Sequence, residues 1–101
     1  MSQAGQRLDK WLWFARFART RTAAARLVAE GRVRVNGARA GAPAKPVRPG
    51  DVLTIAAPHR TAVIRILSAG ERRGPASEAA GLYETLDEGD NRTLVTGAPD
   101  D

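Results

Sequence analysis

Arginine is the residue type whose number and spacing in this sequence indicate a chemical role. Between Arg7 and Arg48 there are 11 basic side chains, 9 of them arginine, and only Asp9 and Glu30 are acidic. The planar guanidinium group can donate two parallel hydrogen bonds to phosphate oxygens and can stack on a base. Such a cluster is typical of polyanion binding, and the alternative explanation is a solvated basic surface or a genomic bias toward arginine.

Groups suited to catalysis are scarce. His59 is the only histidine and there is no cysteine, so a serine or cysteine triad lacks a convincing base-and-nucleophile set and a zinc site lacks ligands. We expect His59 to be an ordinary loop residue. Asp9 falls in the first turn of an expected helix, where it would stabilise the helix dipole or order Arg7 or Arg16. The sequence therefore predicts no enzymatic activity, no metal and no cofactor.

The length and the charge distribution limit the classes of protein to which this chain can belong. A chain of 101 residues corresponds to about one small domain. It has neither a secretory signal nor an apolar run of about 20 residues, so we expect a cytoplasmic protein that does not enter a membrane. Residues 1–83 hold 15 basic and 5 acidic residues, whereas residues 84–101 hold 1 basic and 6 acidic residues. The acidic segment from about residue 85 is predicted to be a mobile tail.

A first amphipathic helix is predicted from residue 8 to about residue 18. Apolar residues recur there three and four positions apart, which is the spacing of one helical face. The residues on this face are Leu8, Trp11, Leu12, Ala15 and Ala18. We expect this face, Trp11 included, to pack into the core.

A second helix is predicted over residues 23–30. Thr20 and Thr22 are both suitable N-caps, because a threonine hydroxyl can accept an unpaired backbone N–H at a helix start. Gly31 tolerates the left-handed conformation in which many helices end. The expected arrangement is helix, short break, helix.

After Gly31 the apolar period changes from that of a helix to that of a strand. Arg32 to Val35 alternate polar and apolar, and Asn36-Gly37 is a strong signal for a tight hairpin turn. Residues 38–49 hold three prolines and are expected to be mostly a wrapping loop after the hairpin. Further strands are predicted over residues 52–55 and 62–67, followed by a loop or short helix over residues 68–80.

Several of these segments together resemble the S4-type RNA-binding domain family. The resemblance rests on Arg7-Leu8-Asp9, Thr20-Arg21-Thr22, the run from Gly31 to Gly37, Lys45-Pro46 and Gly50-Asp51. Within that family, residues 9–17 and 72–84 are similar to the ribosome-associated heat shock protein 15 family. This resemblance implies an α+β fold in which two N-terminal helices pack on a small antiparallel sheet, with a short C-terminal extension.

The resemblance also implies a domain organisation and a set of partners. The expected parts are a flexible N-terminus over residues 1–6, an S4-like domain over 7–67, an extension over 68–84 and an acidic, disordered tail over 85–101. Ribosomal RNA of the large ribosomal subunit is the implied partner, with transfer RNA on stalled subunits that need rescue or recycling. A monomer with no small-molecule substrate is expected. The family often continues into a longer basic segment, from which this acidic end departs.

Charge and resemblance together define a predicted RNA-binding set. The arginines around the interhelical break extend the anion site that a helix start provides, and Arg32 and Arg34 are expected to continue the same basic surface. Trp13 and Phe17 lie four residues apart beside basic residues and are candidates for base stacking, with core packing as the alternative. The predicted RNA-binding residues are Arg7, Lys10, Arg16, Arg19, Arg21, Thr22, Arg26, Arg32, Arg34, Asn36, Lys45 and Arg48.

Two other function classes remain open at this stage. The chain could be a DNA-binding helix-turn-helix protein, or an accessory RNA-binding subunit of an RNA-modifying enzyme. Competition between duplex DNA and structured RNA at equal salt distinguishes the first, and a stable enzyme partner would favour the second. On the leading hypothesis, Arg21→Glu or Arg34→Glu abolishes co-sedimentation with large subunits.

Overall fold

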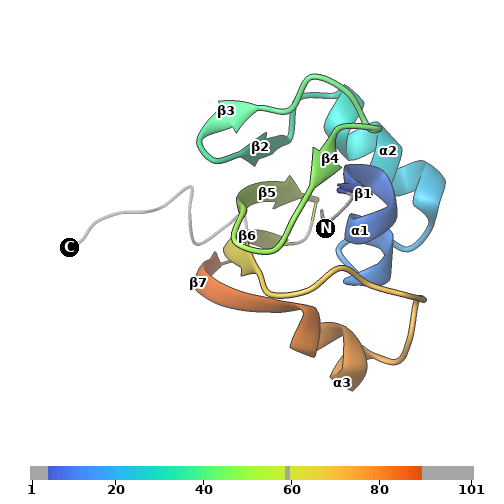
Figure 1. The fold of residues 1–101 in the computed structure, drawn as a ribbon. Helices are drawn as coiled ribbons and strands as arrows, with labels where there is room; N and C mark the ends of the chain where they lie inside the picture. The colour runs from blue at the N-terminus through green and yellow to red at the C-terminus, as the bar shows by residue number, and fades with distance from the viewer. Residues whose placement is uncertain (1–4, 59, 90–101) are drawn as a thin grey trace.

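The computed structural model describes residues 5–58 and 60–89, and it has two helices packed against one face of an antiparallel sheet (Figure 1). Five strands form the sheet in the order β3-β2-β5-β6-β7. Their bounds are Val33–Val35 for β2, Ala38–Arg39 for β3, Val52–Ala57 for β5, Arg60–Ile66 for β6 and Tyr83–Gly89 for β7. A separate two-stranded ribbon joins β1, Gln6–Arg7, to β4, Pro46–Val47. The predicted α+β class is confirmed.

The first helix, α1, spans Leu8–Phe14 and is shorter than the sequence predicts. It ends because Arg16 adopts a left-handed backbone with φ of 66°. The Arg16 N–H donates to the Trp13 carbonyl, and the Phe17 N–H donates to the Leu12 carbonyl at 2.9 Å. This is a Schellman motif with arginine where glycine usually stands. The prediction of a helix to residue 18 is therefore wrong, since no glycine marked this end.

The second helix, α2, spans Arg21–Ala29, so it begins two residues before the predicted start at residue 23 and ends one residue before the predicted end at residue 30. The Thr20 hydroxyl accepts a hydrogen bond from the Ala23 N–H at 3.0 Å, so Thr20 is the N-cap and Thr22 is not. At the other end Gly31 has φ of 79°, and the N–H of Arg32 donates to the Leu27 carbonyl. The predicted C-terminal glycine is confirmed.

The strands follow the predicted order, and β5 and β6 are longer than predicted. Asn36 and Gly37 both have positive φ, 53° and 88°, as a type I′ hairpin turn requires. The residues called a wrapping loop contribute β3 to this hairpin and β4 to the two-stranded ribbon. Strand β6 begins at Arg60, two residues before the predicted start.

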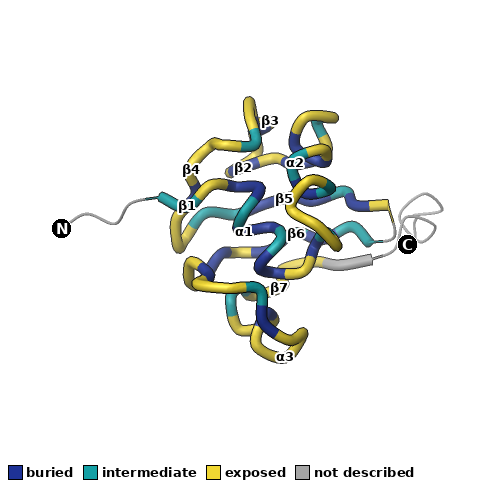
Figure 2. Tube along the Cα trace, turned by 90° about the vertical axis from the view of Figure 1, so that its right-hand side faces the viewer, coloured by how far each residue is buried: buried dark blue, intermediate teal, exposed yellow. Residues whose placement is uncertain are grey.

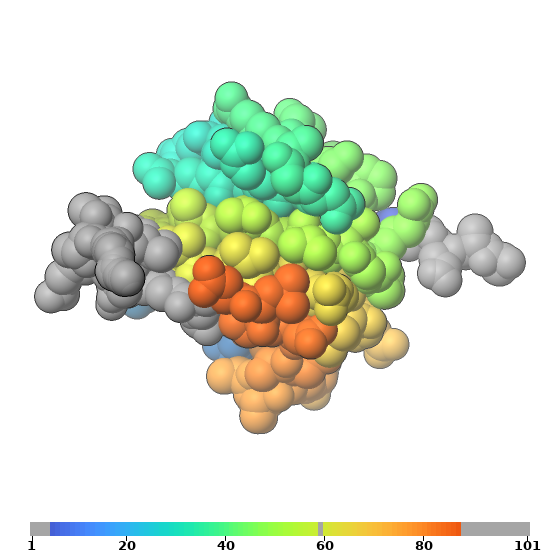
Figure 3. Space-filling model, turned by 90° about the vertical axis from the view of Figure 1, so that its left-hand side faces the viewer, coloured from blue at the N-terminus to red at the C-terminus, as the bar shows by residue number. Residues whose placement is uncertain are grey.

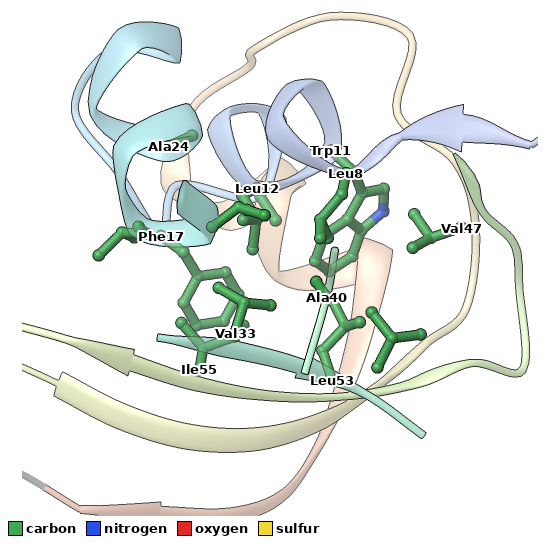
Figure 4. Packing of buried hydrophobic residues seen from close by; sticks show 14 of the residues in the cluster. Leu8, Trp11, Leu12, Phe17, Ala24, Val33, Ala40, Val47, Leu53 and Ile55 are labelled. Atoms are coloured by element: carbon green, nitrogen blue, oxygen red, sulfur yellow. The ribbon is translucent and has the colours of Figure 1, made fainter. Parts of the chain in front are cut away.

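The core lies between the helices and the sheet. Leu8, Trp11 and Leu12 are fully buried, and they face the buried strand residues Val33, Leu53 and Ile55 (Figure 4). Figure 2 shows buried segments of α1, α2 and the central strands turned toward one another. On the opposite face of the sheet no helix of the described residues lies over the strands, and strand residues form the surface there (Figure 3). The core position of Trp11 is confirmed.

The C-terminal part continues the sheet, which corrects the predicted boundaries. After a short helix α3, Ala76–Ala79, and a 3₁₀ turn, η1, Ala80–Leu82, strand β7 pairs with β6 from Ile66↔Tyr83 to Thr61↔Gly89. The prediction of disorder from residue 85 is wrong for residues 85–89, and residues 90–101 lie outside those described. Gln6 is not part of a flexible end either, because it pairs with Val47 in the ribbon.

Candidate nucleic-acid interface

A hollow lined by arginines opens where the connection between the helices meets α2 and the β5–β6 turn. Its volume is about 760 Å³. Five of its lining residues are arginines, and among the described residues that line it only Glu30 is acidic. The lining residues are Arg16, Phe17, Ala18, Arg19, Ala23, Arg26, Leu27, Glu30, Arg32, Ala57, Pro58 and Arg60. Segments far apart in sequence thus bring cationic groups to one place.

The left-handed turn after α1 determines where Arg16 lies. Its Nε donates to the Gly74 carbonyl at 2.7 Å, which ties the turn to the C-terminal extension. Beside it the Arg73 Nη2 donates to the Ala18 carbonyl at 3.4 Å, while the Arg73 Nε is buried and has no partner among the described residues. A further positive charge therefore lies beside Ala18, a lining residue of the hollow, and adds to the attraction for anions there.

Arg60 is a lining residue that the sequence analysis did not single out. Its guanidinium carbon lies 4.4 Å from the centre of the Phe17 ring, and its Nη2 donates to the Tyr83 hydroxyl at 3.1 Å. Residue 60 shares the parity of the buried residues Ala62 and Ile64, so its side chain belongs to the helix-facing side of β6. That alternation was the available signal, but the predicted strand began too late to include it.

The same contact decides the role of Phe17. Its side chain is 6% exposed and belongs to the core cluster, between Trp11 and Tyr83. Of the two roles that the sequence leaves open for Phe17, the structure supports core packing, and the Arg60 guanidinium lies over the ring. Trp13 is half-buried and lies 5.5 Å from the Phe14 ring, so its role in stacking stays a prediction.

A second cationic group is organised around Asp9, which is 3% exposed. Two nitrogens of Arg7 donate to its two carboxylate oxygens at 3.1 and 3.0 Å, and the Arg21 Nε lies 3.9 Å from it. Burial by itself raises the pKa of Asp9, but the hydrogen bonds and charge of Arg7, the Lys10 N–H and the charge of Arg21 outweigh burial and lower it. Asp9 orders Arg7 as expected, and its other partner is Arg21 rather than Arg16.

Two further predicted basic residues, Lys45 and Lys10, lie close to Asp9 and its arginine partners. The carbonyl of Lys45 accepts a hydrogen bond from the Leu8 N–H at 2.9 Å, which holds this exposed lysine beside the start of α1. The Lys10 ammonium lies 5.6 Å from the centre of the Phe14 ring. Thr22 is exposed in the first turn of α2, next to Arg21.

A third group of predicted residues gathers at the hairpin turn. The Asn36 side chain donates to Asp51 at 3.2 Å and accepts from the Val52 N–H at 2.9 Å, while the Arg48 N–H donates to the same aspartate. These bonds fasten the turn to the start of β5, so the Asn36 amide has a structural task. Arg34 is exposed on the sheet face away from the helices and is not a lining residue of the hollow.

By their contacts, the predicted basic residues fall into three groups. Of the two strand arginines that were expected to continue the helical cluster, Arg32 lines the hollow and Arg34 does not. Arg7 and Arg21 surround Asp9, and Arg48 lies at the turn. Of these three groups only the hollow combines several arginines with apolar lining residues, which makes it the strongest candidate for a ligand-binding site.

Other kinds of site find no support in the described part of the chain. No group of three or more histidine, cysteine or acidic side chains there could hold a metal ion. Residues 5–58 and 60–89 likewise contain no helix of sufficient length and apolarity for a bilayer span. His59 lies outside the described residues, so its predicted loop position is untested.

The S4 domain family matches residues 6–53, which include both α1 and α2 and strands β2, β3 and β4. A solved structure described as trimeric heat shock protein 15 from Vibrio cholerae superposes with a TM-score of 0.75. It is 36% identical, over 90% of this chain and 87% of that one. The chain belongs to the heat shock protein 15 family.

Curated relatives agree with this assignment. Heat shock protein 15 of Escherichia coli strain K12 is 45% identical over 80 residues, which are 77% of this chain and 58% of that protein. Small ribosomal subunit protein uS4 of Fervidobacterium nodosum is 43% identical over 61 residues, 60% of this chain and 29% of that protein. The chain thus spans less than two thirds of the length of these relatives.

Proposed function

We propose that this protein is a cytoplasmic RNA-binding protein whose hollow holds the sugar-phosphate backbone of ribosomal RNA. The observation that carries the proposal is the convergence of Arg16, Arg19, Arg26, Arg32 and Arg60 around one hollow with a single glutamate among its described lining residues. Phosphate oxygens suit this arrangement because each guanidinium donates several hydrogen bonds in one plane.

The Asp9 group extends the interface. Arg7 and Arg21 are each about half exposed, so both can reach a phosphate while Asp9 holds them in position. Membership of the heat shock protein 15 family and the likeness to a ribosomal protein support ribosomal RNA as the natural target. We propose the large ribosomal subunit as the binding partner and the rescue or recycling of stalled subunits carrying nascent chain on transfer RNA as the process.

Co-sedimentation with isolated large ribosomal subunits tests this function. The wild-type chain is expected to travel with the subunits through a sucrose gradient, and Arg19→Glu is expected to remain at the top. The affinity falls as salt rises, and reversing one charge in the hollow should make the slope of log affinity against log salt less steep by about 1. If Arg19→Glu and the wild-type protein sediment alike, the hollow is not the binding site.

Arg65→Glu is the matched control for this experiment. Arg65 is an exposed arginine of β6 that pairs with Glu84 at 2.9 Å, and its position alternates with the core-facing residues Ile64 and Ile66. The same charge reversal there should leave co-sedimentation unchanged. Far-UV circular dichroism of both variants establishes that the fold is retained.

The alternatives from the sequence stay testable in the same assay. Duplex DNA that displaces the protein from ribosomal RNA at equal salt would favour the DNA-binding hypothesis. A stable complex with an RNA-modifying enzyme would favour an accessory role. We propose no catalytic activity for this chain itself, and the monomeric state stays a prediction that the sedimentation coefficient of the free protein measures.

A further inference from the structure

We propose that the hollow receives one unpaired nucleotide of the bound RNA, and that its base stacks on the guanidinium plane of Arg60. This inference rests on the proposed function, because it specifies which part of an RNA enters the site. It also reassigns the stacking role that the sequence gave to Phe17. The aromatic ring supports the stacking surface from below and does not touch the base.

The Arg60 guanidinium contacts two neighbours. The Phe17 ring lies under the guanidinium, with 4.4 Å between the guanidinium carbon and the ring centre, and the Tyr83 hydroxyl accepts a hydrogen bond from its Nη2. The two supporting rings are themselves 5.1 Å apart, and Phe17 is part of the buried core. The guanidinium carbon thus lies over the Phe17 ring, and Arg60 is a lining residue of the hollow. Bases of unpaired nucleotides stack on arginine planes of this kind.

The chemistry of the wall suits a nucleotide better than a bare phosphate. Leu27, Ala57 and Pro58 are apolar lining residues of the hollow, and Arg19 and Arg26 contribute charge. A base needs apolar or planar contacts and its phosphate needs cations, so both halves of one nucleotide find partners within the same hollow. The volume of about 760 Å³ falls in the range of about 300–1,000 Å³ that is typical of sites for small molecules.

A paired base cannot use this surface. In an RNA duplex each base is stacked between its neighbours and its edge is occupied by the partner strand, so only backbone and grooves are accessible. A bulged nucleotide or a loop nucleotide presents a free face. The protein should therefore prefer RNA with an extra-helical nucleotide to a fully paired stem of equal length and charge.

Fluorescence anisotropy with two RNA hairpins measures this preference. The hairpins have the same stem, which in both is closed by a non-nucleotide linker, and one stem carries a single-nucleotide bulge as its only unpaired nucleotide. The wild-type protein is expected to bind the bulged hairpin about tenfold more tightly, which is the usual size of one base-stacking contact. With 2-aminopurine at the bulge, stacking in the hollow should change the fluorescence on binding.

The decisive variant is Arg60→Lys, which retains the positive charge and removes the planar group. It should bind the paired hairpin as the wild-type protein does and lose most of the tenfold preference for the bulge. Tyr83→Phe retains the ring and removes the hydroxyl that orients Arg60, so a partial loss of the same preference is expected. Arg65→Lys, the same exchange on the opposite face of β6, should retain the full preference.

Separate outcomes overturn this inference and the proposed function. Equal affinity of the wild-type protein for the two hairpins, with both bound, overturns the nucleotide site and leaves RNA binding intact. An undiminished preference in Arg60→Lys also overturns it. Failure of the wild-type protein to bind either hairpin, or large ribosomal subunits, would instead remove the proposed function and the inference with it. Equal melting temperatures of the variants establish that a lost preference is not a lost fold.

Discussion

Asp9 shows how one buried carboxylate can prepare a cationic surface. It is the one buried charged residue among those that the structure describes, and it accepts hydrogen bonds from Arg7 while Arg21 lies 3.9 Å away. Without it these two guanidinium groups would repel each other and lose their fixed orientation. The carboxylate therefore contributes to folding and, on the proposed function, to the placement of phosphate-binding groups.

We predict that Asp9→Asn lowers the free energy of unfolding at pH 7 by about 1–2 kcal/mol. Breaking a buried ion pair usually costs more, but Arg7 and Arg21 are 50% and 44% exposed and water can solvate them again. Urea unfolding of both proteins measures the difference. A variant as stable as the wild-type protein would show that the pair contributes nothing to stability.

The contribution of Asp9 should also depend on pH. Because the folded state lowers the pKa of Asp9, the stabilisation is complete above the unfolded pKa of about 4 and is lost as pH falls below it. We predict that the stability difference between the wild-type protein and Asp9→Asn shrinks between about pH 5 and pH 3. A difference that stays constant over this range would contradict the lowered pKa.

At the scale of elements, the two helix ends share one geometry and differ in the residue that adopts it. Both α1 and α2 end in Schellman hydrogen bonds, with Arg16 in the left-handed position of one and Gly31 in that of the other. A non-glycine residue in this conformation costs about 1 kcal/mol. At the end of α1 the residue with this unfavourable conformation is Arg16, whose side chain donates to the Gly74 carbonyl and lines the hollow.

We predict that Gly31→Ala lowers the free energy of unfolding by about 1–2 kcal/mol. Its φ of 79° disfavours a side chain, and a Cβ would lie 2.8 Å from the Arg39 Nε, so that arginine must also move. Gly41→Ala is the control, because its backbone is not left-handed and nothing lies within 4 Å of the added Cβ. Thermal unfolding of both variants measures the effect, and equal melting temperatures would contradict the prediction.

For the whole molecule, the extension and the S4-like part share one core. The Trp11 indole N–H donates to the Ser68 carbonyl at 3.0 Å, and the Trp11 and Tyr83 rings are 6.1 Å apart. The Gln6 side chain exchanges two hydrogen bonds with the backbone of Gly70. These contacts join residues more than 50 positions apart, so residues 68–84 are not an independent appendage.

We therefore predict a single cooperative unfolding transition. In a Trp13→Phe variant, Trp11 is the only tryptophan and reports on the contact between α1 and the extension. Its fluorescence and the far-UV circular dichroism should change at the same urea concentration. A fluorescence transition that precedes the loss of secondary structure would mean that the extension separates first.

Much of the local structure was determined by the sequence alone. The Thr20 cap, Gly31 at the end of α2, the Asn36-Gly37 turn and the burial of Trp11 were predictable, because each depends on a residue type and its near neighbours. The family was also recognisable, because several such signals occur in a fixed order. These features follow from backbone conformational preferences and the period of apolar residues.

Only the tertiary structure decided the end of α1, the strand at residues 83–89 and the make-up of the hollow. Arg16 has a left-handed backbone although it is not glycine, and its side chain donates to the Gly74 carbonyl 58 positions away. An acidic segment becomes β7 because β6 offers it an unpaired edge. Arg60 lines the hollow, whereas the Phe17 ring is buried in the core. Each of these outcomes depends on contacts between distant segments, and such contacts exist only after the chain has folded.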